Sequence, residues 1–191
     1  NRLLQGDVGS GKTIVILVAV VFVVSTGAQA TLMVPTEVLA IQHFKSFKAL
    51  LSSFAFNIVL FTGSDKAKER EKKLKFIESG QAAIIIGTHS LFQKKVQFKN
   101  LKLAVIDEQH KFGVIQRQSL ERKGKLNTII MSATPIPRSL ALTVYGDKDL
   151  TVLKQKPKDR PSIETLILQS NKIDNLLVDN LQLNGNTIST T

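Results

Sequence analysis

The chain has 191 residues, of which 43% are hydrophobic and 21% charged, and it contains no cysteine. This composition is typical of a globular domain with a sizeable core. The lack of cysteine excludes a disulfide framework, cysteine-ligated zinc and thiol catalysis. The formal net charge of +11 indicates a polyanionic partner such as nucleic acid. The alternative interpretation is a solvated, lysine-rich surface.

Short apolar runs alternate with longer segments of helical character along most of the chain. The pattern predicts strands at residues 3–4, 31–34, 58–61, 82–86, 101–106 and 128–131, and helices at 14–24, 37–51 and 65–78. Continuous apolar strands that alternate with helices indicate an α/β fold, with a parallel β-sheet covered by helices on both faces. In such sheets ligands bind beyond the carboxyl ends of the strands.

The segment 14–24 is wholly apolar. It is too short to cross a bilayer, which takes about 20 residues as a helix, so it is predicted to be a core helix and no membrane partner is expected. A membrane span is the less favoured alternative.

The C-terminal part has a different character. Residues 154–161 resemble a linker, 162–168 alternate like a strand, 173–183 follow a helical pattern and 184–191 form a polar tail. The predicted organisation is therefore one domain over residues 1–161, followed at 162–191 by the start of a second unit.

The first chemical motif is "GDVGSGKT", which follows a strand and precedes a helix. Glycines let backbone N–H groups converge on a phosphate, and the helix N-terminus favours an anion. Lys12 would reach the β- and γ-phosphates, and the Thr13 hydroxyl would bind Mg²⁺. The predicted ATP site comprises Gly6, Asp7, Val8, Gly9, Ser10, Gly11, Lys12 and Thr13. The alternative is a glycine-rich helix start without function.

Two acids, Asp107 and Glu108, directly follow the apolar run 103–106. A P-loop ATPase needs a carboxylate that holds magnesium and a group that orients or deprotonates the attacking water. Asp107 is the predicted metal partner, acting through water, and Glu108 the predicted base. An acidic turn at a strand end is the alternative.

The P-loop together with "DEQH" resembles the superfamily 2 helicases, whose nucleotide-binding lobe has a RecA-like fold. Four further segments match their motifs in order: "PTEVLAIQH", "TGS", "GTHSL" and "SAT". Two longer segments, "DEQHKFGVIQR" and "SATPIPRSLALTVYGDKDL", resemble the RecG family of bacterial branched-DNA helicases. The transcription-repair coupling factors share part of this pattern and are the alternative. The resemblance implies a cytoplasmic bacterial protein that acts on forked or branched DNA.

The resemblance also implies roles for matching residues. Residues that would couple the γ-phosphate to movement between lobes are Gln109, His110, Ser132, Ala133, Thr134 and Arg138. Residues that would contact a DNA backbone are Pro35, Thr36, Gln42, His43, Thr62, Gly63, Thr88 and His89. Thr36 is also a good helix N-cap, and His89 has the alternative of an ordinary loop histidine. The cations between Lys66 and Lys75 alternate with acids and are interpreted as a solvated helix face.

The family pattern also includes a wedge domain, adenine-binding residues and a second lobe with arginines, and none of these matches a segment of the 191 residues. We therefore expect ATP binding with little turnover from this segment alone. A truncated or decaying gene product, or a fragment, is one hypothesis for this difference. A non-catalytic remnant and a self-sufficient P-loop kinase are alternatives of other classes.

Overall fold

The computed structural model of the chain describes residues 1–93, 95–107, 126–134, 149–154, 176–178, 181–184 and 187–190. The chain forms two compact units, Asn1–Pro157 and Lys158–Thr191. The units are considered separately below.

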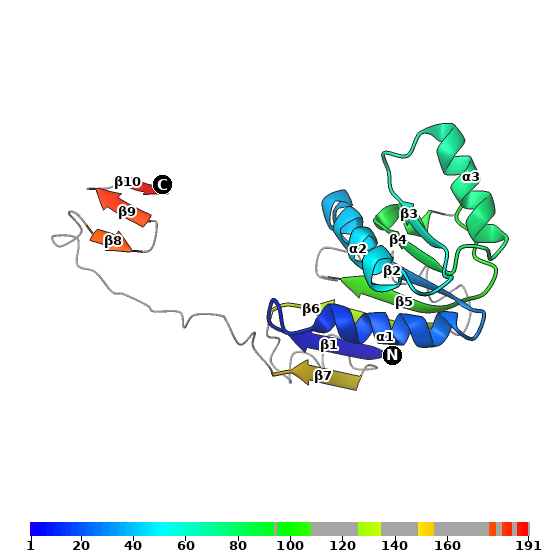
Figure 1. The fold of residues 1–191 in the computed structure, drawn as a ribbon, viewed down its shortest axis with the longest axis horizontal. Coiled ribbons are helices and arrows are strands. Elements are labelled where there is room, and N and C mark those ends of the chain that lie inside the picture. The colour runs from blue at the N-terminus through cyan, green and yellow to red at the C-terminus, as the bar shows by residue number, and fades with distance from the viewer. Residues whose placement is uncertain are drawn as a thin grey trace. The chain divides into compact units, whose positions relative to one another are not determined.

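The first unit contains a seven-stranded sheet in the order β3-β4-β2-β5-β6-β1-β7 (Figure 1). Every neighbouring pair is parallel. The strands are β1 Arg2–Gly6, β2 Gln29–Met33, β3 Ile58–Phe61, β4 Ile84–Gly87, β5 Leu101–Asp107, β6 Asn127–Ser132 and β7 Asp149–Leu153. The described helices are α1 Lys12–Val24, α2 Glu37–Leu50, α3 Ala67–Glu78 and the short 3₁₀ helix η1 His89–Phe92. The predicted parallel α/β sheet is confirmed.

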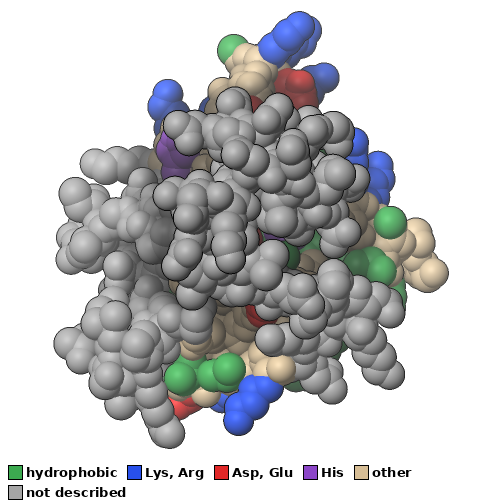
Figure 2. Space-filling model, turned by 90° about the vertical axis from the view of Figure 1, so that its left-hand side faces the viewer, with side chains coloured by type: hydrophobic (Ala, Val, Ile, Leu, Met, Phe, Trp, Pro, Cys, Tyr) green, Lys and Arg blue, Asp and Glu red, His purple; other side chains and the backbone are tan. Residues whose placement is uncertain are grey.

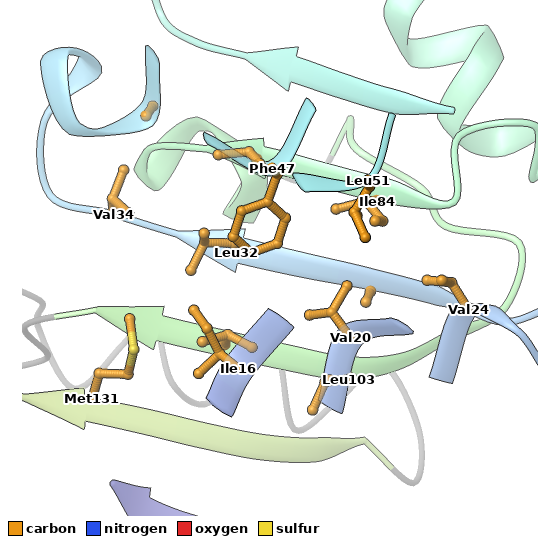
Figure 3. Close-up of a cluster of buried hydrophobic side chains, with 14 of the residues drawn as sticks. Ile16, Val20, Val24, Leu32, Val34, Phe47, Leu51, Ile84, Leu103 and Met131 are labelled. Atoms are coloured by element: carbon orange, nitrogen blue, oxygen red, sulfur yellow. The ribbon is translucent and has the colours of Figure 1, made fainter. Parts of the chain in front are cut away.

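Helices cover both faces of this sheet, as predicted. Successive side chains of a strand point to opposite faces, and Ile84 and Ile86 of β4 join the core beneath α1 and α2. Ile85, between them, packs with Ile77 of α3 on the opposite face. Figure 3 shows the larger cluster, in which Phe47 of α2 lies over Leu32 of β2.

Helix α1 buries only one stripe of its side chains, although its apolar sequence predicted a core helix. Ile16, Val20 and Val24, each four residues from the next, are buried against the sheet. Four other apolar side chains are 42–74% exposed: Ile14, Val15, Val18 and Phe22. Burial is set here by the position of each residue around the helix, which an all-apolar run does not reveal. Among the described residues, no helix has the length and apolarity needed to cross a membrane.

Strand β7 was not predicted. It lies at the edge of the sheet, where it pairs with β1 alone, and none of its residues is buried. An edge strand of this kind lacks the continuous apolar run that identified the central strands. Its Leu150 does pack against the small buried cluster of Leu3 and Ile130.

The second unit contains three antiparallel strands: β8 Leu176–Val178, β9 Leu181–Asn184 and β10 Thr187–Thr190. The predicted helix at 173–183 is wrong over β8 and β9, and the predicted polar tail at 184–191 contains β10. The overlooked sequence signals are Asp179-Asn180 and Gly185-Asn186, residue types that bound strands and whose positions fall between the ranges of consecutive strands. The predicted strand at 162–168 lies outside the described residues, as does the linker after Lys154. The predicted boundary at 161/162 stays a prediction.

Candidate functional site

The motif residues meet at one edge of the first unit's sheet. Parallel strands end at the same edge, and the residues that end or follow six of them are Gly6, Val34, Thr62, Thr88, Asp107 and Ser132. We call this the carboxyl edge, and the opposite side of the sheet the amino edge. The strand order places the end of β6 between the ends of β1 and β5, so Ser132 stands between the phosphate loop and Asp107.

The phosphate loop, residues 6–13, has the backbone that its glycines allow. Gly9 and Gly11 have φ angles of 78° and 89°, a left-handed conformation that favours glycine. A Cβ added to Gly6 would collide with the Ser10 hydroxyl. Ser10 N donates to Asp7 O at 3.1 Å, and Val8 N donates to the Asp7 carboxylate at 2.7 Å. These bonds close the loop immediately before α1.

Lys12 lies at the centre of this loop. Its ammonium donates to Gly6 O at 2.6 Å and to Asp7 O at 2.7 Å, so the charge lies inside the curve of the backbone. The first N–H groups of α1 have no acceptor within the helix, and the helix dipole favours an anion beside them. The loop therefore has the charge and the donors that a phosphate requires.

The donor set fits magnesium bound together with a nucleotide. Thr13 is in the first turn of α1, and Asp107 ends β5 and is half-buried. The Ser10 hydroxyl is buried without a hydrogen-bond partner among the described residues. No cluster of three metal-ligating side chains occurs in the part of the chain that is described. Mg²⁺ typically needs only one or two carboxylates plus substrate phosphates, which suits this arrangement.

A pocket of about 370 Å³ lies beside the phosphate loop. It is lined by the end of β1, the segment after β6 and the end of β7: Gln5, Gly6, Asp7, Ala133, Val152, Leu153 and Lys154. Next to the pocket, the Ser132 hydroxyl donates to Thr134 O at 3.1 Å and also lies 3.1 Å from the Thr134 hydroxyl. The predicted coupling residues Ser132, Ala133 and Thr134 are thus adjacent to the phosphate loop.

Asp107 faces His43 of α2 across the carboxyl edge. His43 Nε2 lies 3.7 Å from Asp107 Oδ2, and the two side chains are 13% and 17% exposed. The sequence assigned His43 to DNA contact and gave no sign of this pairing, because 64 positions separate the two residues. Glu108, Gln109, His110 and Arg138 lie outside the described residues.

The "TGS" loop, residues 62–64, is held by acids that the sequence did not single out. Glu37, at the start of α2, accepts from Ser64 N at 3.1 Å and from the Ser64 hydroxyl at 2.8 Å. Asp65 accepts from Thr62 N at 3.1 Å. The Thr62 hydroxyl lies 3.0 Å from the Ser64 hydroxyl. The loop is therefore fixed from both sides.

Two cations of α3 support the same loop, which corrects their predicted role as part of a solvated face. Arg70 lies 4.5 Å from the centre of the Phe61 ring and donates to Thr62 O at 3.0 Å. Lys73 pairs with Asp65 and Glu69. Burial lowers the pKa of Lys73, but its bonds to the two acids outweigh burial and raise the pKa above 10.5. The stability that a raised lysine pKa contributes is lost only as pH rises through the raised pKa of the folded protein. Lys73 therefore stays charged near neutrality. Exposed cations, as predicted, are Lys66, Lys68, Lys72 and Lys75.

The predicted DNA-contacting residues divide into buried and exposed ones. Thr62 and Thr88 are buried, and the Thr88 hydroxyl lies 3.3 Å from that of Ser90. Exposed ones are Thr36, Gln42, Gly63 and His89, and Pro35 is half-buried. Thr36 also caps α2, accepting from Leu39 N at 3.3 Å. Ser64, which the prediction omitted, is exposed between Gly63 and Asp65.

Charged side chains of both signs are visible on this side of the molecule (Figure 2). Figure 2 shows the side toward which the arrows of β5, β6 and β7 point in Figure 1, and lysine and arginine side chains lie at several places around its rim, with acidic side chains also in view.

Comparison with known proteins identifies relatives of the chain. Residues 1–143 match the family described as DEAD/DEAH box helicase. The chain is 47% identical over 175 residues to the ATP-dependent DNA helicase RecG of Thermotoga maritima, covering 91% of this chain and 22% of that protein. It is 46% identical over 178 residues to the RecG of Bacillus subtilis, covering 93% of this chain and 26% of that protein. The chain thus spans about a quarter of the length of these relatives.

Solved structures agree with the sequence relatives. The structure of RecG bound to a three-way DNA junction superposes with a TM-score of 0.74 and 46% identity, covering 85% of this chain and 22% of that one. The helicase domain of Hef from Pyrococcus furiosus has the same fold, with a TM-score of 0.61 and 21% identity, covering 81% of this chain and 35% of that one. The matched segment, the RecA-like sheet and the order of the motifs all indicate the same family. The chain belongs to the DEAD/DEAH box helicase family, within which it resembles the RecG helicases.

Proposed function

We propose that the chain is the ATP-binding motor lobe of a RecG-like branched-DNA helicase that acts in recombination and in the repair of stalled replication forks. The observation that carries this proposal is the arrangement at the carboxyl edge. Asp107, Ser132 and the phosphate loop stand there at the ends of β5, β6 and β1, three neighbouring strands. The similarity to RecG over about nine-tenths of the chain supports the same function.

In the proposed site the nucleotide phosphates lie against the N-terminus of α1. Lys12 would exchange its bonds to Gly6 O and Asp7 O for phosphate oxygens. The Thr13 hydroxyl would bind Mg²⁺, and Asp107 would hold it through water. When bound, the metal neutralises charge on the phosphates. Glu108 would orient the attacking water, and Ser132 and Thr134 would sense the γ-phosphate from the adjacent strand end.

We propose that DNA lies along the ends of β2, β4 and β3. The exposed groups there are Thr36, His89, Gly63 and Ser64, together with the backbone of their loops. Contacts of this kind hold a phosphodiester backbone and carry no sequence information. The relative solved with a three-way junction supports branched DNA as the substrate of the whole protein. In bacteria such a protein works in the cytoplasm, where the chromosome lies.

A second helicase lobe and a wedge domain are the proposed partners of this lobe in the whole protein. In related NTPases a supplied arginine accelerates phosphoryl transfer by about 10³–10⁵. The family resemblance assigns such arginines to the second lobe. The 191-residue segment by itself should therefore bind Mg²⁺ and ATP, with poor discrimination between nucleotide bases, and turn ATP over at close to the uncatalysed rate.

The test is a steady-state ATPase measurement on the purified 191-residue chain, with forked DNA, linear DNA and no DNA. We expect turnover near background in all three and no preference for forks. The whole protein should hydrolyse ATP when forked DNA is added, and Glu108→Gln in the whole protein should abolish this. Robust DNA-stimulated turnover by the 191 residues alone would show that the site is complete without a second lobe, and would refute the proposal.

A further inference from the structure

His43 occupies the inward-facing side of α2. It lies three residues after Ala40 and four before Phe47, both of which are fully buried, so it belongs to the same helical stripe. Its ring meets the Phe47 ring edge-on, with centroids 6.4 Å apart and an interplanar angle of 81°. The imidazole is therefore held by packing, and its orientation is fixed by the core beneath it.

A polar ring on the inward face of a helix needs a polar partner, and the Asp107 carboxylate lies beside it. The 3.7 Å between Nε2 and Oδ2 exceeds a hydrogen-bond length, so the two side chains make a close polar contact without a direct hydrogen bond. It engages one oxygen of the carboxylate. Both side chains are more than four-fifths covered, so solvent has little access to the contact.

Helix α2 also organises the proposed DNA-binding loops. Thr36 caps its N-terminus, and Glu37 in its first turn holds both Ser64 N and the Ser64 hydroxyl. His43 stands seven residues from Thr36, which is about 10 Å along a helix axis. A shift of α2 that follows a change at these loops would therefore also move the imidazole relative to Asp107.

We propose that His43 is a positioning residue for Asp107 and that, through α2, it couples binding of magnesium and nucleotide to binding of a nucleic-acid backbone. This inference rests on the proposed function. Groups that orient a metal site from outside its ligands typically change metal affinity by about 10–100-fold when mutated. Coupling between two ligands is reciprocal. The factor by which DNA changes the affinity for magnesium and nucleotide should therefore equal the factor by which magnesium and nucleotide change the affinity for DNA.

The experiment titrates Mg²⁺ against the 191-residue chain at a fixed concentration of fluorescent ADP, with and without a single-stranded oligonucleotide. His43→Ala should raise the Mg²⁺ concentration at half-maximal binding by about 10-fold. His43→Gln should retain most of the affinity, since its amide nitrogen can stand near the position of Nε2. The control is Lys45→Gln, which removes an exposed cation from the same helix and should leave the half-maximal concentration unchanged.

The second measurement is the effect of the oligonucleotide on the same titration. In the wild type it should shift the half-maximal Mg²⁺ concentration, and in His43→Ala the shift should vanish. A third readout, independent of mutant folding, is the ¹⁵N spectrum of the wild-type His43 ring, which should change when Mg²⁺ and ADP are added together and not with ADP alone.

The outcomes separate this inference from the function on which it rests. A wild-type chain whose ADP binding is indifferent to Mg²⁺ would refute the proposed function. Magnesium-dependent wild-type binding that His43→Ala leaves unchanged would overturn the positioning role alone. An equal loss in His43→Ala and His43→Gln, accompanied by lower Tm values, would show that the ring serves only packing. An oligonucleotide shift that persists in His43→Ala would overturn the coupling.

Discussion

The two edges of the sheet use polar side chains in opposite ways. At the amino edge, neutral amides bind the backbone: Gln29 donates to Ile77 O and Ala82 O and accepts from Asn100 N. Asn57 donates to Gln81 O, and Asn1 accepts from Thr128 N. At the carboxyl edge the principal groups are charged: Lys12 lies within the phosphate loop, Glu37 holds the "TGS" loop and Asp107 faces His43.

The difference shows what each edge contributes. A neutral amide satisfied by the backbone fixes the ends of strands and has no further capacity for a ligand. A charged group held in a loop can exchange its partner for a phosphate or a metal. Mutations at the amino edge should therefore lower the free energy of unfolding and leave ligand affinity intact. Mutations at the carboxyl edge should weaken ligand binding and leave the free energy of unfolding intact.

The largest effect is expected for Gln29→Leu. The leucine would fill a similar volume but would remove all three hydrogen bonds of the amide, those to Ile77 O and to the buried Ala82 O and that from Asn100 N. At about 1 kcal/mol for each of the three lost hydrogen bonds, the free energy of unfolding should fall by roughly 3 kcal/mol, measured by urea denaturation. The affinity of the folded variant for Mg²⁺ and ADP should equal that of the wild type. A weaker affinity in the folded variant would contradict the division between the edges.

A smaller effect, on binding, is expected for Glu37→Ala. This change removes both acceptors that hold Ser64, so the "TGS" loop should lose its position and affinity for single-stranded DNA should fall by about five-fold, or about 1 kcal/mol. Fluorescence anisotropy with a labelled oligonucleotide would measure it.

The matched control for Glu37→Ala is Glu78→Ala, which removes the same charge from an exposed residue at the end of α3. Loss of a negative charge by itself favours binding of a polyanion, so Glu78→Ala should bind DNA slightly more tightly. Tighter binding by both variants would mean that Glu37 acts through charge alone.

The smallest effect is expected for Asn57→Ala. Its amide makes a 3.1 Å bond to Gln81 O at an exposed position, where a hydrogen bond contributes about 0.5–1.5 kcal/mol. The free energy of unfolding should fall by about that amount, with both ligand affinities unchanged. No detectable loss of stability would show that exposed amides do not contribute to the amino edge.

Most of the first unit was predictable because its central strands are buried on both faces. Residues 82–86 and 103–106 contain continuous apolar side chains, which only a covered strand requires. The same rule missed β7, an edge strand with no buried residue. The helical pattern read in 173–183 was wrong over residues 176–178 and 181–183, which lie in the short strands β8 and β9.

The candidate site was predictable where function demands a local pattern. The phosphate loop is contiguous, and its glycine conformations follow from its sequence. The pairing of His43 with Asp107 and the hold of Glu37 on Ser64 join residues that are distant in sequence. Only the parallel strand order brings them together, and no spacing in the chain encodes that proximity.

The most direct test of the carboxyl edge as a nucleotide site is calorimetric titration of the 191-residue chain with ADP and Mg²⁺. The wild type should bind one nucleotide per chain. Lys12→Ala should weaken binding by at least about 100-fold, or about 2.7 kcal/mol, because it removes the charge held inside the loop. Lys48→Ala, which removes an exposed cation from α2, should bind as the wild type does. Equal affinity of the wild type and Lys12→Ala would contradict the account.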